Sequence, residues 1–461
     1  MIHPTLAELA AALPCNPQAL HADQATALLA QFVQPLADSA APREEVGIFE
    51  ALGRVLACDV VSPLSVPPHD NSAMDGYAFA GSQLQAGAPL TLHVVGTVLA
   101  GATWSAPIGT GECLKIMTGA AMPPGLDTVV PQELTHSDSA NSANSAHITI
   151  AANTVRCGDN RRQKGEDLLA GSVALPQGAL LTPAALGLLA SLGLPRVLVR
   201  RRLRVAYFSS GNEILSLGEP PRAGAVYDSN RYTLFGLLTR LGVQVIDFGV
   251  VPDDPAQLAA ALLQAAPQAD VLLTSGGASA GEADHLRSTL ERLGDAAFWR
   301  IDMRPGRPLA VGRLASDKII AKTGSSPYAA SATSYQNNSF MTTYGPLVIG
   351  LPGNPVAAMV SFLAFVRPAL LRLMGSTQAP TPLLRAVCTE ALHKKPGRTE
   401  YQRAWLSNAP DGTLQVRSTG NQGSGVLSSM VQANALIVLA HEQGAVAVGD
   451  QVSVVLLDAV M

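Results

Sequence analysis

Residues 270–284, DVLLTSGGASAGEAD, place two carboxylates just after a glycine-rich turn. Residues 271–273 are apolar and indicate a buried strand, and the small residues TSGG at 274–277 stand at its carboxyl end. In an open parallel sheet, ligands bind at that end of the strands, and glycine lets backbone N–H groups approach a phosphate closely. Glu282 and Asp284 supply the carboxylate oxygens that Mg²⁺ prefers. These residues therefore indicate a site for an oxyanion and a metal ion.

An ordinary strand-to-helix turn with solvated acids explains the same residues equally well, because glycine-rich turns are common. Asp270 stands before the strand, at the end away from any such ligand. We expect Asp270 to be a solvated residue at the start of the strand. Other parts of the chain must decide between a binding site and a simple turn.

Three segments in the first half of the chain also carry polar side chains in loops. Residues 67–79, PPHDNSAMDGYAF, put Asp70 among small and apolar residues, and IMTG puts Thr118 at the end of a short strand. Residues 160–167, NRRQKGED, cluster arginines with Asp167. Each has a plain structural explanation, as a fastened turn, a hairpin bend or a solvated charge run. Against a phosphate, the same arginines would be bidentate donors.

Three segments in the second half strengthen the ligand hypothesis. SSGNEI places Glu213 after a strand, MRPGRP places Arg304 and Arg307 around a Pro-Gly turn, and GLPGNP at 350–355 enters an expected helix whose N-terminus suits an anion. Together these turns predict a site for an anionic, phosphorylated ligand with a divalent cation. The sequence has no Ser/His/Asp order, Walker A motif or GxGxxG, which argues against a hydrolase triad, a P-loop NTPase and a dinucleotide oxidoreductase.

Composition bounds the class of protein. At 461 residues the chain is too long for one ordinary core, so we expect several domains. The net charge of −4, from 31 basic and 35 acidic residues, gives no basic footprint for nucleic acid. The five cysteines are dispersed, and the amino terminus lacks the pattern of a signal peptide. Because no uninterrupted apolar run of about 20 residues is present either, we expect a cytoplasmic protein with reduced thiols and no membrane partner.

The first half is expected to be helical and then β-rich. Apolar spacing over about 6–36 predicts an amino-terminal helical segment with Asp23 as a plausible N-cap, and a second helix is expected from residue 46. Strand patterns then predict a β-rich module to about residue 150, in which the polar run 136–147 is a hairpin tip. A helix returns at 181–194.

From about 196 to 373, strands alternate with helices, which is the signature of an α/β sheet. The expected helices cover 232–241, 255–265 and 283–293, and the expected strands include 243–248, 271–273 and 310–311. A Ser-rich interruption at about 314–345 predicts a surface excursion or a lid. After about 376, short strands with Gly and Pro between them predict a small β domain.

The order of these motifs resembles that of the molybdopterin molybdenumtransferases, the MoeA type enzymes related to the last domain of gephyrin. The matching pieces cover almost the entire chain apart from the two polar insertions, and include PPHDNSAMDGYAF, IMTGAAMPPGLDTVV, KGEDLLAG, SSGNEI, YDSNRY, TSGGASAGEADH, RPGRPLAVG, GLPGNPVAAMVSF and GRTEYQRAWL. Several long motifs in a fixed order are far more specific than any one of them.

The resemblance implies a multidomain α/β plus β fold. It would consist of a helical N-terminal segment with an inserted β-rich module, an α/β molybdopterin-binding domain and a small C-terminal β domain. On this sequence the boundaries would be 1–54 and 153–200 for an N-terminal linking domain, 55–152 for the β-rich domain, 201–375 for the α/β domain and 376–461 for the C-terminal domain. A homodimer is also implied, with the active site between the α/β unit of one subunit and the β-rich module of the other.

Enzymes of this kind insert molybdenum from molybdate into adenylylated molybdopterin and release AMP, with Mg²⁺ as the usual divalent ion. By motif position, the resemblance implies catalytic roles for Asp284, Glu213, Asp70 and Asp167, the first two also as metal ligands. The implied substrate-binding residues are Thr118, Ser275, Gly276, Gly277, Ser279, Arg304, Arg307, Pro352 and Pro355. The molybdopterin adenylyltransferase would be a further partner.

The chain departs from the family pattern in places. Lysines are common where Arg304 and Arg307 stand, and arginine exchanges a point charge for a planar donor; Asn212 replaces a carboxylate before Glu213. Two other functions stay open. One is a non-catalytic, gephyrin-like scaffold, against which the acidic and glycine positions argue. The other is a molybdopterin adenylyltransferase, which shares the α/β unit but has no counterpart to the remaining parts of this chain.

Overall fold

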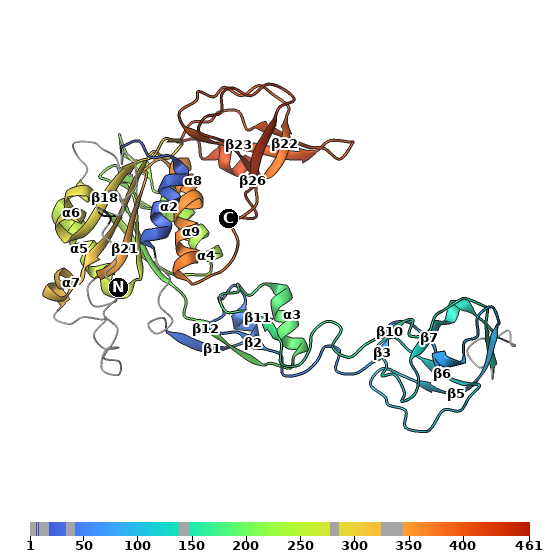
Figure 1. The fold of residues 1–461 in the computed structure, drawn as a ribbon. Coiled ribbons are helices and arrows are strands. Elements are labelled where there is room, and N and C mark those ends of the chain that lie inside the picture. The colour runs from blue at the N-terminus through green and yellow to red at the C-terminus, as the bar shows by residue number, and fades with distance from the viewer. Residues whose placement is uncertain are drawn as a thin grey trace.

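The computed structural model describes residues 6, 8, 18–33, 42–137, 147–276, 285–323 and 344–461. Figure 1 shows four parts: an α/β unit, a C-terminal β part beside it, a linking part, and a β-rich module at the far end of the molecule. The chain is therefore elongated, and the β-rich module stands well away from the α/β unit. The predicted tip within 136–147 and most of the predicted excursion at 314–345 lie outside the described residues.

The α/β unit is built on a six-stranded sheet. Its strands are, in order, β16 (Gln244–Val251), β13 (Arg204–Ser210), β17 (Val271–Ser275), β21 (Tyr344–Leu351), β20 (Pro308–Ala315) and β18 (Gly294–Arg300). The first four are parallel, whereas β20 pairs antiparallel with β21 and β18 antiparallel with β20. The sheet is thus mixed rather than parallel throughout, because β20 runs opposite to its neighbours β21 and β18.

Helices cover both faces of this sheet. One core packs alternate strand residues such as Val205 and Leu273 against α2 (Ala22–Phe32), α4 (Ser229–Arg240) and the run of α8 (Pro355–Ser361), the π-helix η7 (Phe362–Val366) and α9 (Arg367–Leu373). The intervening residues, such as Ala206 and Leu272, pack against α5 (Pro255–Ala265), α6 (His285–Leu293) and α7 (Ser316–Thr323). Near-continuous apolar strands are what burial on two faces requires.

Several helices start at ordinary N-cap residues, but the predicted N-cap of α2 is wrong. The Asp254 carboxylate accepts from the N–H groups of Ala256 and Gln257 at the start of α5. The N-cap of α2 is His21 rather than the predicted Asp23, which lies in the first turn. The Gln24 side chain accepts from the His21 N–H and fixes that start instead. α7 also gives regular structure to the beginning of the predicted polar excursion.

The run from α8 to α9 is the one segment of the described chain that is apolar and long enough to cross a membrane. Two thirds of it is buried, and its residues Phe362, Phe365 and Leu370 belong to the core under the sheet. It therefore has the properties of a core helix.

The linking part is small and has its own core. It pairs β1 (Arg43–Gly47) with β12 (Arg196–Arg200) and β2 (Val60–Val61) with β11 (Val173–Leu175), and packs them against α3 (Pro183–Ser191). The helix predicted from residue 46 is wrong: β1 ends at Gly47 and only a 3₁₀ turn, η1 (Ile48–Ala51), follows. Pairing with β12, some 150 residues away, overrides the local apolar pattern.

The β-rich module is a second six-stranded sheet. Its order is β7 (Thr128–Pro131), β4 (Gly76–Phe79), β6 (Glu112–Ile116), β5 (Leu90–Val98), β9 (His147–Ile150) and β8 (Thr135–Ser137). The ribbon of β3 (Asn71–Ser72) and β10 (Arg161–Arg162) joins it to the linking part.

The C-terminal part closes on itself. Its strands β22 (Leu384–Cys388), β23 (Thr399–Asn408), β24 (Leu414–Ser418), β25 (Ala435–Leu439) and β26 (Gln451–Leu456) form one sheet, in which β23 pairs with both β24 and β25. α10 (Ser428–Gln432) precedes β25. A two-residue strand of the α/β unit, β19 (Met303–Arg304), joins the edge of this sheet beside β23.

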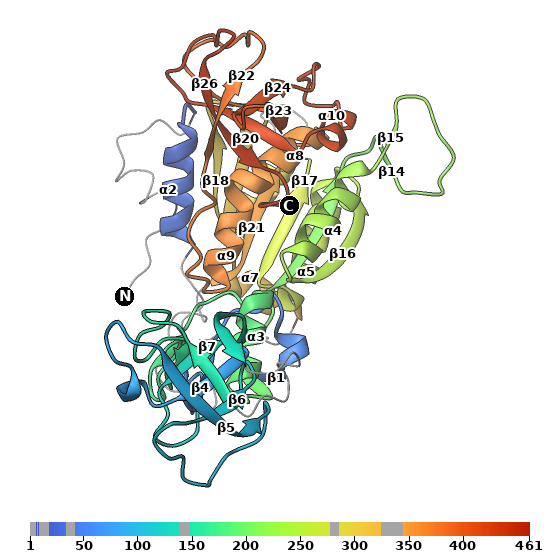
Figure 2. The same ribbon diagram turned by 90° about the vertical axis from the view of Figure 1, so that its right-hand side faces the viewer.

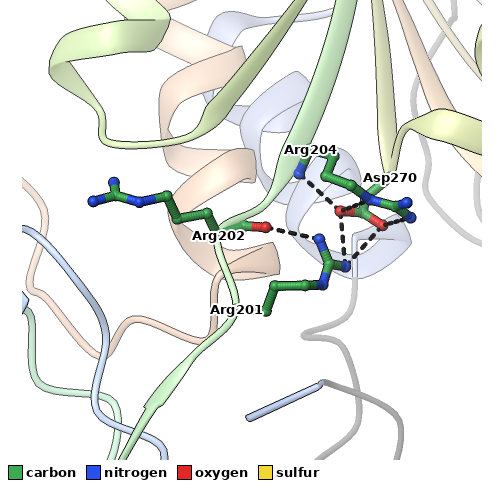
Figure 3. Close-up of polar contacts among 4 residues, drawn as sticks. All are labelled: Arg201, Arg202, Arg204 and Asp270. Atoms are coloured by element: carbon green, nitrogen blue, oxygen red, sulfur yellow. Dashed lines mark hydrogen bonds and ion pairs between the residues drawn. The ribbon is translucent and has the colours of Figure 1, made fainter. Parts of the chain in front are cut away.

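Asp270 is not the solvated residue that the sequence suggests. Its side chain is 7% exposed and receives hydrogen bonds from the guanidinium groups of Arg201 and Arg204, at 3.1 and 2.9 Å, and from the Arg204 N–H at 2.8 Å (Figure 3). The neighbouring Arg202 points away from this cluster, as Figure 3 shows, and donates to the Gly242 carbonyl. Asp270 thereby fixes the segment that leaves the linking part against the start of β17.

Replacing this carboxylate tests the anchor. Asp270→Asn should lower the free energy of unfolding by about 3–5 kcal/mol, because it leaves two partly buried guanidinium groups without their counter-charge. Chemical denaturation of the full chain measures the change. Glu291→Gln is the matched control: its ion pair with Arg287 is half-exposed, and the expected change stays within about 0.5 kcal/mol. Equal effects of the two variants would contradict the anchoring role.

Candidate functional site

A large cavity lies at the carboxyl edge of the parallel strands and has a volume of about 1010 Å³. The ends of β13, β17 and β21 form its floor, and the turn at 303–308 forms one wall. The parallel pair of β14 (Ile214–Leu215) and β15 (Val226–Tyr227) forms another. Arg398 and residues 422–425 of the C-terminal part close the remaining side. Two of the four parts of the chain therefore share this cavity.

Close backbone contact at the floor explains why glycine stands there. Gly276 has φ +92°, and a Cβ at this position would lie 2.3 Å from the Ser210 carbonyl oxygen. The Gly276 N–H donates to the Leu351 carbonyl at 3.1 Å, and a Cβ added at Gly353 would lie 3.7 Å from the Gly276 Cα. The glycine turn after β17 and the GLPGNP turn after β21 are thus packed together without side chains between them.

Two polar residues at the start of α4 hold this floor in place. Asn230 Nδ2 donates to Ser275 Oγ at 2.6 Å and to the Gly353 carbonyl at 2.7 Å. Asp228 accepts from Ser209 Oγ at 2.9 Å and caps α4 through the Arg231 N–H. The ends of the three strands that form the floor, β13, β17 and β21, are therefore tied to one helix start.

Several buried polar atoms around the floor have no hydrogen-bond partner within the described chain. They are Ser210 Oγ, Asp228 Oδ2, Asn230 Oδ1, Asp253 Oδ1 and Thr274 Oγ1. Burying such atoms unpaired costs about 1–3 kcal/mol each, so a polar ligand or ordered water is expected to satisfy them. The floor is therefore suited to a polar ligand.

Positive charge lines the wall at 303–308. Arg304 and Arg307 are both exposed and face the cavity, and β19 pairs Arg304 with Glu400 of β23. Arg398 also lines the cavity and forms an ion pair at 2.7 Å with the buried Glu400. Guanidinium groups in this arrangement are strong donors to phosphate and other oxyanions.

Arg403 supports the loop that closes the cavity. It is 1% exposed and donates to the carbonyls of Asn421 and Gly423 and to Ser429 Oγ. Burial, and secondarily the charge of Arg304, lower the pKa of Arg403 to about 10. Within the described residues no carboxylate pairs with Arg403, so its charge adds to that of the cavity wall.

Three carboxylates of the described chain line the cavity: Glu213 on the β14–β15 side, Asp228 on the floor and Asp253 beside it. No three such groups among the described residues stand close enough to enclose a metal ion by themselves. A Mg²⁺ ion needs no such cage, since it commonly uses one or two carboxylates together with ligand phosphate oxygens and water. The donor set therefore fits a divalent ion that is held partly by its ligand.

The residues predicted from the sequence fall into three groups. Seven of them line the cavity: Glu213, Ser275, Gly276, Arg304, Arg307, Pro352 and Pro355. Gly277, Ser279 and Asp284 lie outside the described residues, so their predicted roles stay predictions. Asp70, Thr118 and Asp167 lie in the segments around β3 and β10 and do not line this cavity.

The third group forms a polar surface of its own. The Lys164 N–H donates to Asp70 at 2.8 Å, and Arg161 lies 3.5 Å from the same carboxylate. Thr118 donates to Asp75 through its hydroxyl at 2.6 Å and its N–H at 2.7 Å, and the first of these bonds is the main cause of the lowered pKa of Asp75. Asp167 lies on the adjacent exposed segment.

Sequence reasoning missed several residues of both sites. Asp75, Asp228 and Asn230 stand inside motifs that carried the resemblance, and their acid and amide side chains were a usable signal. Arg398 and residues 422–425 also stand inside motifs that carried the resemblance, GRTEYQRAWL and QGSGVLSSMVQANALIVL, whereas Asp253 reaches the cavity only through tertiary packing.

Three family models match the chain, in order. Residues 20–193 match "MoeA N-terminal region (domain I and II)", residues 206–372 match "Probable molybdopterin binding domain", and residues 385–457 match "MoeA C-terminal region (domain IV)". The cavity floor and the arginine turn lie in the second of these spans, and the closing loop lies in the third.

Similar proteins cover nearly the full length. A molybdopterin molybdenumtransferase of Haemophilus influenzae is 38% identical over 412 residues, which are 89% of this chain and 93% of that protein. One from a Nostoc species is 35% identical, covering 88% and 86%. The crystal structure of a molybdopterin biosynthesis MoeA protein from Pyrococcus horikoshii aligns with a TM-score of 0.72 at 26% identity, covering 95% of this chain and 100% of that one.

The packing of the floor gives a direct test. Gly276→Ala should destabilise the chain by about 1–3 kcal/mol, because its Cβ meets the Ser210 carbonyl in a backbone conformation that favours glycine. Gly187→Ala is the control: it lies in α3 with open space around it, and the change should stabilise by up to about 1 kcal/mol. Thermal unfolding of both variants measures the difference, and a neutral Gly276→Ala would refute the contact.

Proposed function

Because the chain belongs to the molybdopterin molybdenumtransferase (MoeA) family, it is an enzyme of molybdenum cofactor biosynthesis, and we propose that it transfers molybdenum from molybdate to adenylylated molybdopterin with release of AMP. The observation that carries this proposal is the cavity at the carboxyl edge of the sheet. It combines room for a large ligand, a floor of closely packed glycines and a wall of arginines.

The cavity suits the charge of such a substrate. A molybdopterin joined to AMP carries a phosphoanhydride, and molybdate is an oxyanion, so both need donors and positive charge. Arg304, Arg307 and Arg398 supply guanidinium donors from one side, with the buried charge of Arg403 behind them. The unpaired polar atoms of the floor, such as Ser210 Oγ and Asn230 Oδ1, supply neutral hydrogen-bonding positions on the other side.

Mg²⁺ is the proposed divalent ion, with Glu213 and Asp284 as its ligands and Asp253 within reach of the same cavity. When bound, it would neutralise charge on the oxygens of the anhydride and so favour its cleavage. Asn230 and Asp228 orient the floor, and the loop at 422–425 limits access of water from the C-terminal side. The chain's own residues thus bind, orient and shield the substrate.

A homodimer is the proposed assembly. Asp70, Thr118 and Asp167 lie on or beside the β-rich module, which Figure 1 shows at the far end of the molecule from the α/β unit that carries the cavity. Figure 2 shows this module at the end opposite the C-terminal part. A second subunit could supply this module to the cavity. Support comes from unusually exposed apolar side chains on the linking part, namely Phe49 (99% exposed), Leu52, Val61 and Val173.

We also propose a cytoplasmic location, with the molybdopterin adenylyltransferase as the partner that provides the substrate. The four cysteines that the structure describes are free thiols, as a reducing compartment requires. An enzyme that uses a reactive adenylylated intermediate also benefits from standing close to the enzyme that makes it.

Activity tests the chemistry. The purified chain is incubated with adenylylated molybdopterin, molybdate and Mg²⁺, and AMP is measured. Glu213→Gln should lower kcat by about 100-fold or more, because it removes a carboxylate from the proposed metal site. Glu219→Gln is the matched control in the connection between β14 and β15: its amide oxygen can still accept from the Ser216 N–H, so activity should be kept. Normal AMP release by Glu213→Gln would rule out its role, and ATP-dependent adenylylation of molybdopterin would point to the alternative reaction.

Assembly has its own test. Phe49→Glu should convert a dimer into monomers in size-exclusion chromatography with light scattering, because it buries a charge in the proposed interface. Val431→Glu, at an equally apolar position that is 84% exposed in the C-terminal part, should stay dimeric. A wild-type chain that is monomeric at micromolar concentration, or a dimeric Phe49→Glu variant, would contradict this interface.

A further inference from the structure

A group of histidines lies on the β-rich module, on a sheet face that the proposed reaction does not use. His93 stands on β5, His147 on β9 and His136 on β8, which are three adjacent strands at one end of the sheet. All three side chains are exposed.

Strand register puts these side chains on the same face. His93 pairs directly with His147, and Thr91 pairs with Thr149 two residues further along. The Thr91 and Thr149 hydroxyls lie 3.0 Å apart. The side chains of both pairs therefore project from the same face of the sheet. His136 pairs with Thr149, which makes it the diagonal neighbour of His147.

The opposite face is the apolar core of the module. Leu92, Ile148 and Ile150 alternate with the residues just named and are at most 1% exposed. The period-two alternation of strands therefore holds the imidazoles in solvent and leaves them no place in the core.

Two of the rings already stand at a distance suited to one metal ion. The centroids of His93 and His147 are 5.0 Å apart, and the ring planes are inclined at 46°. Two imidazoles bound to one tetrahedral ion, each at an M–N distance of about 2.0–2.1 Å, have centroids about 5 Å apart. The cross-strand pair thus has the spacing of a chelate.

A third ligand is within reach. Among the described residues no three histidine, cysteine or carboxylate side chains have their donor atoms converged, so the third must come by side-chain rotation. Glu112 pairs with His93 across β6, but its carboxylate is held by the Gly109 N–H at 2.6 Å. His136 is exposed and diagonal to His147, about 7–8 Å away between backbones, which long side chains bridge.

We propose that His93, His147 and His136 form a surface site for a borderline transition-metal cation such as Zn²⁺, with water in the fourth position. Imidazole nitrogens select Zn²⁺, Ni²⁺ and Cu²⁺ over Mg²⁺, which prefers oxygen. The bound ion ties β8 and β9 to β5 at the edge of the module. It is distinct from the divalent ion of the cavity.

Isothermal titration of the full-length, metal-stripped chain with Zn²⁺, in excess Mg²⁺ to occupy oxygen sites, tests the proposal. The wild type is expected to bind one Zn²⁺ per chain. The double variant His93→Gln/His147→Gln is expected to lose this binding. His136→Gln should weaken Zn²⁺ binding by at least about tenfold. Loss of a residue that only supports a metal ligand already has an effect of that size. Zn²⁺ should also raise the unfolding temperature of the wild type but not of the double variant.

His393→Gln is the control, because His393 is exposed on the C-terminal part and should bind Zn²⁺ as the wild type does. Without metal, all variants should unfold at the wild-type temperature, since the side chains are exposed. Unchanged Zn²⁺ affinity and stoichiometry in the double variant would overturn the proposal, as would equal retention of Mg²⁺ and Zn²⁺ at this site.

Discussion

The cavity depends on one constraint: three parallel strands must end so close together that their backbones touch. Gly276 lies between the Ser210 and Leu351 backbones, and a single added methyl group would collide with the Ser210 carbonyl oxygen. Asn230 then locks the arrangement, since its amide reaches both Ser275 and Gly353. Phosphate-binding chemistry at this edge is possible because the described residues leave a cavity above the ends of the strands.

The C-terminal part belongs to the site rather than being an appendage. β19 of the α/β unit pairs with β23, so the arginine turn is shared between the two parts. Arg403 supports the closing loop from beneath, and Glu400 holds Arg398 at the cavity. At the opposite end of the sheet, Asp270 joins the linking part to the same unit. The relative positions of the parts therefore rest on buried charged groups, whose partners must be present for the fold to be stable.

Local sequence patterns predicted the elements whose formation depends on neighbouring residues. α5 has the predicted bounds, and the strand at 271–273 and the turns around Arg304 and Pro352 were found because period, glycine and proline mark them in the sequence. Long-range pairing explains the errors. The helix expected from residue 46 yields to β1 because β12 supplies a partner, and the sheet is mixed because β20 runs opposite to both of its neighbours. Asp270 is covered by Arg201, from the segment before β13, and by Arg204, at the start of β13. Asp253 enters the cavity by the same kind of distant contact, whereas Arg398 stands inside the motif GRTEYQRAWL.

The central claim is that the cavity of one subunit works with the β-rich module of another, and complementation between two defective chains tests it most directly. Glu213→Gln damages the cavity and Asp167→Asn damages the module, so each homodimer should be inactive. After the two are unfolded, mixed and refolded together, random pairing should restore about one quarter of wild-type AMP release, since half of the dimers carry one intact composite site. No recovery in mixtures that contain verified heterodimers would contradict the account, because it would mean that both groups act within one chain.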